Sequence, residues 1–177
     1  MATNRSPGSR SERPLLHLAG NRLFLAVPQD EKATLHMIEK YPTLFFFTNS
    51  YPESYGKIIT GSVSGDFLCP FLIADFCADI RSRRDDPGLA RNPLIFYAYR
   101  QDLFCAAVLL GAYLMLEEGM SPETAAKVFQ GDLQLYAGRA FLVELAGCLK
   151  AIDERRRSRS FLHSIAEEVG GDLCRCH

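Results

Sequence analysis

The sequence predicts an α/β fold in which a small mixed sheet is flanked by helices. Residues 94–97 are apolar and rich in β-branched and aromatic side chains, as in a buried strand. Residues 104–116 are apolar around almost the whole helical circumference, so a helix there must be covered on nearly every side. Strand-like and helix-like segments alternate before this pair, which favours parallel strands joined by helices.

Length and composition predict one domain between two tails. A chain of 177 residues can bury a substantial core, and we expect the domain over residues 15–169. Residues 1–14 are rich in Ser, Arg and Pro without an apolar period, which predicts a disordered tail, and 170–177 form a C-terminal tail. These first residues lack the apolar core of a signal peptide, and the cysteines lie mostly in helical patterns. The expected compartment is the cytoplasm or the nucleus.

Five elements are expected before the central strand. Residues 22–27 form the first strand, and 28–41 have helical character that ends at a Tyr-Pro pair. The aromatic run at 43–48 is the next strand. Turn-forming residues then surround a possible short strand at 57–60. A proline opens the helix 71–81, because proline is tolerated in the first helical turn.

Three helices are expected after the helix at 104–116, which a glycine at position 119 ends. Ser121, Pro122 and Glu123 mark the first, which runs to about residue 130, since Ser is a good N-cap and Pro fits the first position. A longer helix covers about 140–155, where apolar residues recur at helical spacing. Residues 161–169 form a possible short amphipathic helix.

The turn between the central strand and the central helix is the candidate functional site. Backbone N–H groups converge at such a turn and the helix dipole is positive there, which suits an anion. With the helix 106–113 (AAVLLGAY), the segment resembles the phosphate-binding loop and following helix of cysteine-dependent protein tyrosine and dual-specificity phosphatases. The loop positions are Ala98, Tyr99, Arg100, Gln101, Asp102, Leu103, Phe104 and Cys105.

These loop positions lack the catalytic groups of the family. Where members carry His-Cys-x5-Arg, this chain has Ala98, Tyr99 and Cys105. The family attacks phosphorus with a thiolate and holds the phosphate oxygens with an arginine. A phenol is mostly protonated at neutral pH and too bulky for a phosphate cradle. The loop also has no glycine, and Asp102 adds a negative charge. The sequence therefore predicts a degenerate loop with no catalytic residue.

The whole chain resembles one subfamily, the cell-division-cycle-fourteen dual-specificity phosphatases of mitotic exit. The residues that carry the resemblance are 21–26 (NRLFLA), 46–48 (FFT), 69–71 (CPF), 106–113 (AAVLLGAY), 121–125 (SPETA) and 148–152 (CLKAI). Coverage runs from about 21 to 152. Members have two tandem phosphatase-like domains of which only the second is catalytic, and this chain is similar to the first. The segment 28–41 looks more helical than the family, and 131–140 looks shorter.

The resemblance implies a catalytically inactive domain that packs against a catalytic phosphatase domain, in the same or a separate chain, and helps to bind protein substrates. Two alternatives remain open: a standalone phosphatase with an unrecognised nucleophile, Cys77 or Cys105, and a standalone adaptor for phosphoproteins. Tyr99 and Arg100 are interpreted either as a vestige that still contacts a partner or, preferably, as residues that only close a turn.

Other motifs have simpler interpretations. Cys77 and Arg83 have the Cys-x5-Arg spacing, but they lie in a predicted helix without glycine, which favours coincidence. Asp66, near the place of the family's general acid, is interpreted as a turn residue. The remaining candidate ligands are isolated or lack a fourth partner and predict no metal site: His17, His36, His163, Cys174, Cys176 and His177. No cofactor is expected. A net charge of -1 argues against nucleic acid, and 104–116 is too short for a bilayer, which needs ~20 residues.

Overall fold

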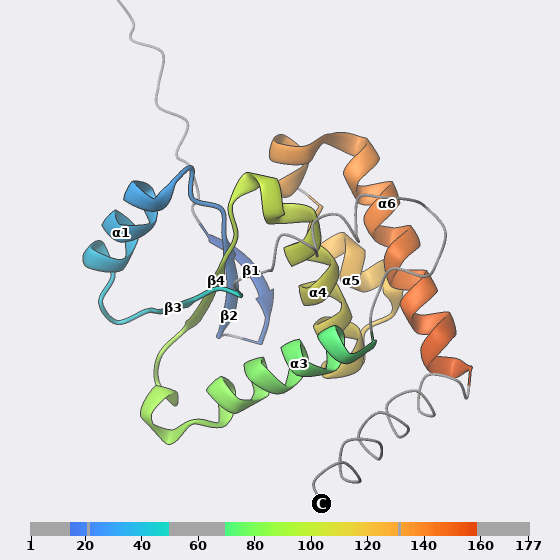
Figure 1. The fold of residues 1–177 in the computed structure, drawn as a ribbon, viewed down its shortest axis with the longest axis horizontal. Helices are drawn as coiled ribbons and strands as arrows, with labels where there is room; N and C mark the ends of the chain where they lie inside the picture. The colour runs from blue at the N-terminus through green and yellow to red at the C-terminus, as the bar shows by residue number, and fades with distance from the viewer. Residues whose placement is uncertain (1–14, 21, 50–69, 131, 159–177) are drawn as a thin grey trace, which may run out of the picture.

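A four-stranded sheet of order β1-β2-β4-β3 lies at the centre of the molecule (Figure 1). The computed structural model describes residues 15–20, 22–49, 70–130 and 132–158. The strands are β1 (Leu15–Ala19), β2 (Leu23–Ala26), β3 (Phe45–Phe47) and β4 (Leu94–Tyr97). The helices are α1 (Glu31–Lys40), α3 (Pro70–Asp85), α4 (Leu103–Leu116), α5 (Pro122–Val128) and α6 (Asp132–Arg157), with short 3-10 helices η1 (Pro87–Leu89) and η2 (Arg100–Asp102).

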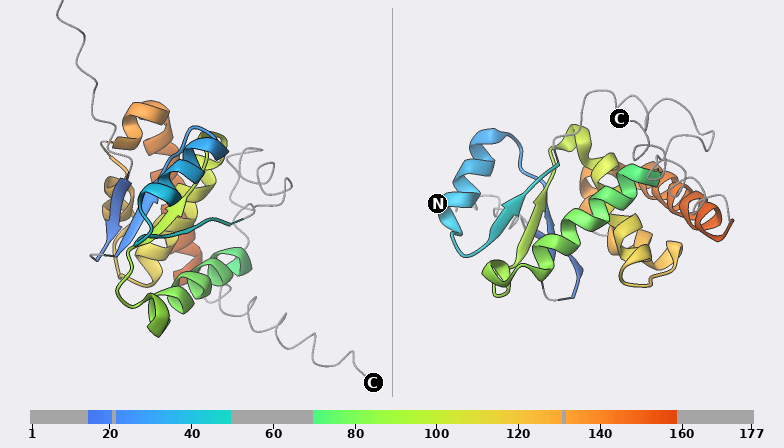
Figure 2. Two further views of the ribbon diagram at one scale, coloured as in Figure 1. Left: turned by 90° about the vertical axis from the view of Figure 1, so that its left-hand side faces the viewer. Right: turned by 60° about the horizontal axis from the view of Figure 1, so that its bottom comes forward.

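The sheet is mixed, as the sequence predicts. Strand β4 pairs in parallel with β2 on one side and β3 on the other, and β1 pairs antiparallel with β2. In Figures 1 and 2, α1 lies on one side of the sheet, whereas α4, α5 and α6 lie on the other. The ring of Phe96 packs against Phe47 and Phe76, with centroids 5.4 and 5.5 Å away, so this face of β4 points toward α3 and the main core. Because strand residues alternate, Ile95 and Tyr97 point to the α1 side.

Most expected elements are present, with three differences. Residues 15–19, left unassigned by the sequence, form β1, because a hairpin with β2 pairs their backbone. Helix α3 continues beyond the expected end at residue 81 to Asp85. Helix α6 begins at Asp132 with a segment that the sequence did not indicate, and the helix expected at about 140–155 follows Gly138, whose backbone is not helical (φ 77°, ψ 178°). Glycine adopts this backbone conformation without a Cβ clash, so it can stand at the break between the two helical segments.

The predictions for 1–14, 57–60, 161–169 and 170–177 lie outside the described residues.

Both ends of the α4–α5 connection follow local sequence signals. Gly119 has φ 69°, and the Met120 N–H donates to the Leu114 carbonyl (3.1 Å), which caps the last turn of α4. The Ser121 hydroxyl oxygen accepts from the Thr124 N–H (3.2 Å), with Pro122 at the first helical position. The expected stop and start are therefore confirmed, and they set the short link that returns α5 onto α4.

Helix α4 is buried almost completely. Twelve of its residues are buried: Leu103, Cys105, Ala106, Ala107, Val108, Leu109, Leu110, Gly111, Ala112, Tyr113, Leu114 and Met115. The Tyr113 hydroxyl accepts from the Arg84 guanidinium (3.1 Å) and lies 3.4 Å from the Glu118 carboxylate, which satisfies the polar group at the end of the helix. Because the sheet, α3, α5 and α6 cover α4 from different sides, it is the innermost element of the fold.

A glycine allows α6 to approach α4. A Cβ atom at Gly111 would lie 2.8 and 2.9 Å from the two methyl groups of Leu149, which is itself fully buried. Such distances are closer than van der Waals contact, so a side chain at position 111 would push against α6. The small residue at this position thus fixes the spacing of the two helices.

Arg22 binds the segment that leads into β4. Its guanidinium donates to the carbonyl oxygens of Leu89 (2.7 Å), Arg84 (3.3 Å) and Asn92 (3.5 Å). The Leu94 N–H in turn donates to the Arg22 carbonyl (2.6 Å). One side chain thus bonds to three backbone carbonyls, of which that of Leu89 also accepts from the Asn92 N–H (2.9 Å). These bonds hold the start of the central strand in place.

We predict that Gly111→Ala lowers the free energy of unfolding by about 1 kcal/mol, because overpacking costs ~1–3 kcal/mol and exceeds the ~0.5–1 kcal/mol that alanine gains in a helix. Urea denaturation measures the change. Gly147→Ala on α6 is the matched control: a Cβ there meets nothing within 4 Å, so we expect a gain in stability. Equal changes in the free energy of unfolding for the two variants would contradict the close approach of Leu149 to the α4 backbone at Gly111.

Candidate functional site

The candidate loop, residues 98–105, lies where the sequence places it, between the central strand and the innermost helix. Strand β4 ends at Tyr97, and the Ala98 N–H extends the ladder by donating to the Ala26 carbonyl (3.1 Å). Tyr99 then caps η2, and α4 begins at Leu103. The predicted order of strand, turn and helix is confirmed, but the turn contains a 3-10 helix that the sequence did not indicate.

This 3-10 helix uses backbone groups that an anion would need. The Asp102 N–H donates to the Tyr99 carbonyl (2.9 Å), and the Leu103 N–H donates to the Arg100 carbonyl. A phosphate cradle requires free N–H groups that converge on the ligand. With the Ala98 N–H in the sheet, three of the loop's N–H groups have protein acceptors, so the loop has fewer donors for a bound anion.

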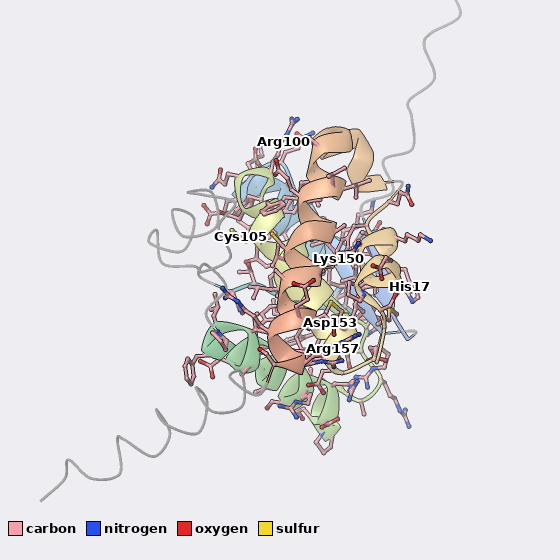
Figure 3. The ribbon with its side chains drawn as sticks, turned by 90° about the vertical axis from the view of Figure 1, so that its right-hand side faces the viewer. His17, Arg100, Cys105, Lys150, Asp153 and Arg157 are labelled. Atoms are coloured by element: carbon pink, nitrogen blue, oxygen red, sulfur yellow. The ribbon has the colours of Figure 1, made fainter. Side chains whose placement is uncertain are left out.

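The loop side chains diverge rather than converge. Arg100 and Gln101 are exposed, Ala98, Leu103 and Cys105 are buried, and Tyr99, Asp102 and Phe104 are half-buried. The ring of Phe104 packs edge-on against Phe141 of α6, with centroids 5.4 Å apart. In Figure 3, Arg100 lies near the top of the view and Cys105 lies well below it. The loop's cation and its thiol are therefore not brought together.

Tyr99, the second residue of this loop, contacts other parts of the protein. Its ring packs edge-on against Tyr97, with centroids 6.2 Å apart. The hydroxyl groups of Thr34, on α1, and Tyr99 form a hydrogen bond (3.4 Å). Sequence reasoning missed Thr34, which lies 65 positions away. A usable signal was Asp30, whose carboxylate caps α1 by accepting from the Ala33 N–H (2.7 Å) and thereby places Thr34 in the first turn.

The environment of Cys105 disfavours a thiolate. Burial raises the pKa of the Cys105 thiol, and the nearby Asp102 carboxylate raises it further, although a backbone hydrogen bond partly offsets these effects. A nucleophilic cysteine requires the opposite, a lowered pKa beside positive charge. Cys105 is thus a buried, protonated thiol.

Cys77 and Arg83, which have the Cys-x5-Arg spacing, do not form a catalytic site. Both residues lie within α3, because this helix continues past the expected end at residue 81 and includes Arg83. The Arg83 guanidinium lies over the ring of Phe47, 4.8 Å from its centroid, and forms an ion pair with Asp79. Burial, with a smaller contribution from Glu117, raises the pKa of Cys77 from 9.0 to about 12, against a weaker lowering by Arg81.

No metal-ligand cluster of three or more His, Cys, Asp or Glu side chains occurs in the described part of the chain. His17 and His36 are exposed, and the His17 ring nitrogen contacts the Gly20 carbonyl. Asp66, His163, Cys174, Cys176 and His177 lie outside the described residues.

Comparisons with protein-family models, curated proteins and solved structures found no match to this chain. Over the residues that the structure describes, every helix is too short or too polar to cross a membrane.

We predict that stability falls above pH 9, and that Cys77 accounts for part of the fall. Between the thiol's ordinary pKa of 9.0 and about 12, the unfolded chain ionises Cys77 and the native chain does not. Unfolding then releases a proton, so rising pH favours unfolding by up to ~1.4 kcal/mol per pH unit. Urea denaturation from pH 8 upward should show a shallower decline for Cys77→Ala than for wild type.

Val108→Ala is the control for this measurement, because it also truncates a buried side chain but removes no titratable group. Val108→Ala should lower the free energy of unfolding at every pH. The slope of that free energy against pH should equal the wild-type slope. If the free energy of unfolding falls with pH equally in wild type and Cys77→Ala, Cys77 does not account for part of the fall.

Proposed function

We propose that this chain is a catalytically silent phosphatase-like domain of the cell-division-cycle-fourteen type. In this role it packs against a catalytic phosphatase domain, in the same or a separate chain, and helps to form a groove for protein substrates. The observation that carries the proposal is the turn between β4 and α4. This turn stands at an anion-binding position of the fold, but Tyr99 fills the nucleophile's place and bonds to Thr34.

Two features support the family assignment. The small mixed sheet has its central strand flanked by two parallel neighbours, and this strand leads through the turn into an almost completely buried helix. The resemblance to the subfamily is most specific in that helix and in the proline-started helix after it. Both helices contribute residues to the buried core of the domain.

The chemistry of the turn supports a domain without catalytic activity. An active loop presents converging N–H groups, a lowered thiol pKa and a guanidinium over the phosphate. Here the N–H groups of Ala98, Asp102 and Leu103 have protein acceptors, and Asp102 raises the pKa of the Cys105 thiol. The alternative of an active enzyme that uses Cys77 or Cys105 is disfavoured, since both thiols are buried and their pKa values are raised.

The proposed partner role rests mainly on the sequence resemblance, because the later helices expose little apolar surface. A missing partner domain would leave an apolar face on the later helices. Among the described residues of α5 and α6, Val143 is the one large apolar side chain that is strongly exposed (73%). A partner that covers these helices would therefore make mainly polar contacts, through groups such as Lys150 and Glu123, which form an ion pair (3.4 Å).

We predict no cysteine-dependent hydrolysis of para-nitrophenyl phosphate. Wild type, Cys77→Ser and Cys105→Ser should all give the buffer rate, because neither thiol is ionised at neutral pH. Release of para-nitrophenolate is followed by absorbance, and a catalytic dual-specificity phosphatase serves as positive control. Turnover in wild type that either substitution abolishes would overturn the silent assignment.

We also predict a complex with a catalytic domain of the resembled subfamily. Sedimentation velocity of the mixture should show a species larger than either component. A single-domain dual-specificity phosphatase is the matched control and should sediment independently. If neither mixture forms a complex, the partner role fails and a standalone adaptor becomes the better explanation.

A further inference from the structure

Helix α1 is weakly attached to the rest of the described structure. Of the described helices, it alone lies on its side of the sheet (Figures 1 and 2). Thr34 is its one buried residue (4% exposed). Leu35 and Ile38, and Tyr41 at its end, are 54%, 40% and 36% exposed, whereas Ala33 and Met37 are half-buried. A segment with so little buried apolar surface lies at the low end of local stability.

The hydrogen bonds that end α1 are internal to the helix. Asp30 caps its start, accepting from the Ala33 N–H through the carboxylate and from the Thr34 N–H (3.0 Å) through the carbonyl. The Tyr41 N–H donates to the Met37 carbonyl (3.0 Å) at its end. No cap of α1 depends on another element, so the helix can move without leaving its own backbone groups unsatisfied.

The contact of α1 with the β4–α4 turn lies in its first turn. The Thr34 hydroxyl, which donates to the Asp30 carbonyl (3.0 Å), also reaches the Tyr99 hydroxyl oxygen (3.4 Å). The pKa of the neighbouring Tyr97 is raised by burial first, and then by Tyr99 and Glu31, which places the Glu31 carboxylate near this tyrosine pair. The Thr34–Tyr99 hydroxyl pair thus joins the first turn of α1 to the carboxyl end of β4.

We propose that α1 is a cover that opens as a unit over the β4–α4 turn, and that the Thr34–Tyr99 hydrogen bond holds it closed. Tyr99 is then a positioning residue for α1. The proposal does not depend on the phosphatase-like assignment, because it rests on the attachment of α1 alone. Opening separates α1 from Tyr97 and Tyr99 and leaves the main core around α4 intact.

Amide hydrogen exchange of the full 177-residue chain, read by mass spectrometry, tests the proposal. In wild type we expect the amides of residues 34–41 to exchange faster than those of α4. Tyr99→Phe keeps the ring and removes the hydroxyl, and should raise the rates in α1 by about two- to tenfold, as loss of one hydrogen bond would. Thr34→Val should raise the same rates, and α4 should not change in either variant.

Tyr97→Phe is the matched control, because it removes a hydroxyl from the adjacent ring that does not bond to α1 in the described structure. It should leave the exchange of α1 at the wild-type rate. Protection of α1 equal to that of α4 in wild type would overturn the proposal. So would unchanged α1 rates in Tyr99→Phe and Thr34→Val, equal rises in Tyr97→Phe and Tyr99→Phe, or a parallel rise in α4.

Discussion

Burial of α4 on all sides is the constraint on which the rest of this structure depends. Each large apolar side chain taken from water contributes ~1.5–3 kcal/mol, and α4 presents such side chains around its whole circumference. One neighbouring layer cannot cover it, so the sheet, α3, α5 and α6 each bury a different side. The glycine at position 111 is part of this arrangement, since it lets Leu149 approach the α4 backbone.

The position of the β4–α4 turn follows from that burial. Strand β4 is the central strand and α4 the innermost helix, so the residues between them can scarcely move without disturbing the core. The chemistry of the turn is not constrained in the same way. A tyrosine that bonds to α1 and an aspartate beside a buried thiol are compatible with the same backbone path. The backbone path of the turn therefore does not by itself decide which side chains occupy it.

Polar side chains complete the structure at the ends of elements rather than in the core. Arg22 satisfies three carbonyls before β4, and Arg84 joins the Tyr113 hydroxyl to Glu118 at the end of α4. On α6, the buried Asp153 carboxylate is paired with Arg156 (3.3 Å) and Arg157 (2.8 Å); Figure 3 labels Asp153 and Arg157 on this helix. In each case a charged group lies where backbone or carboxylate groups would otherwise be unsatisfied.

The sequence by itself determined the local elements and the chemical identity of the turn. Short-range signals carry these: the apolar run of β4, the unbroken apolar circumference of α4 and the Ser121-Pro122 start of α5. Only the tertiary structure decided which distant groups meet, such as Thr34 with Tyr99, Arg22 with Leu89, and Gly111 with Leu149. It also decided that the turn contains a 3-10 helix and that a further helical segment precedes the kink at Gly138. The reason is physical: propensity and periodicity act over a few residues, whereas side-chain contacts depend on how whole elements pack.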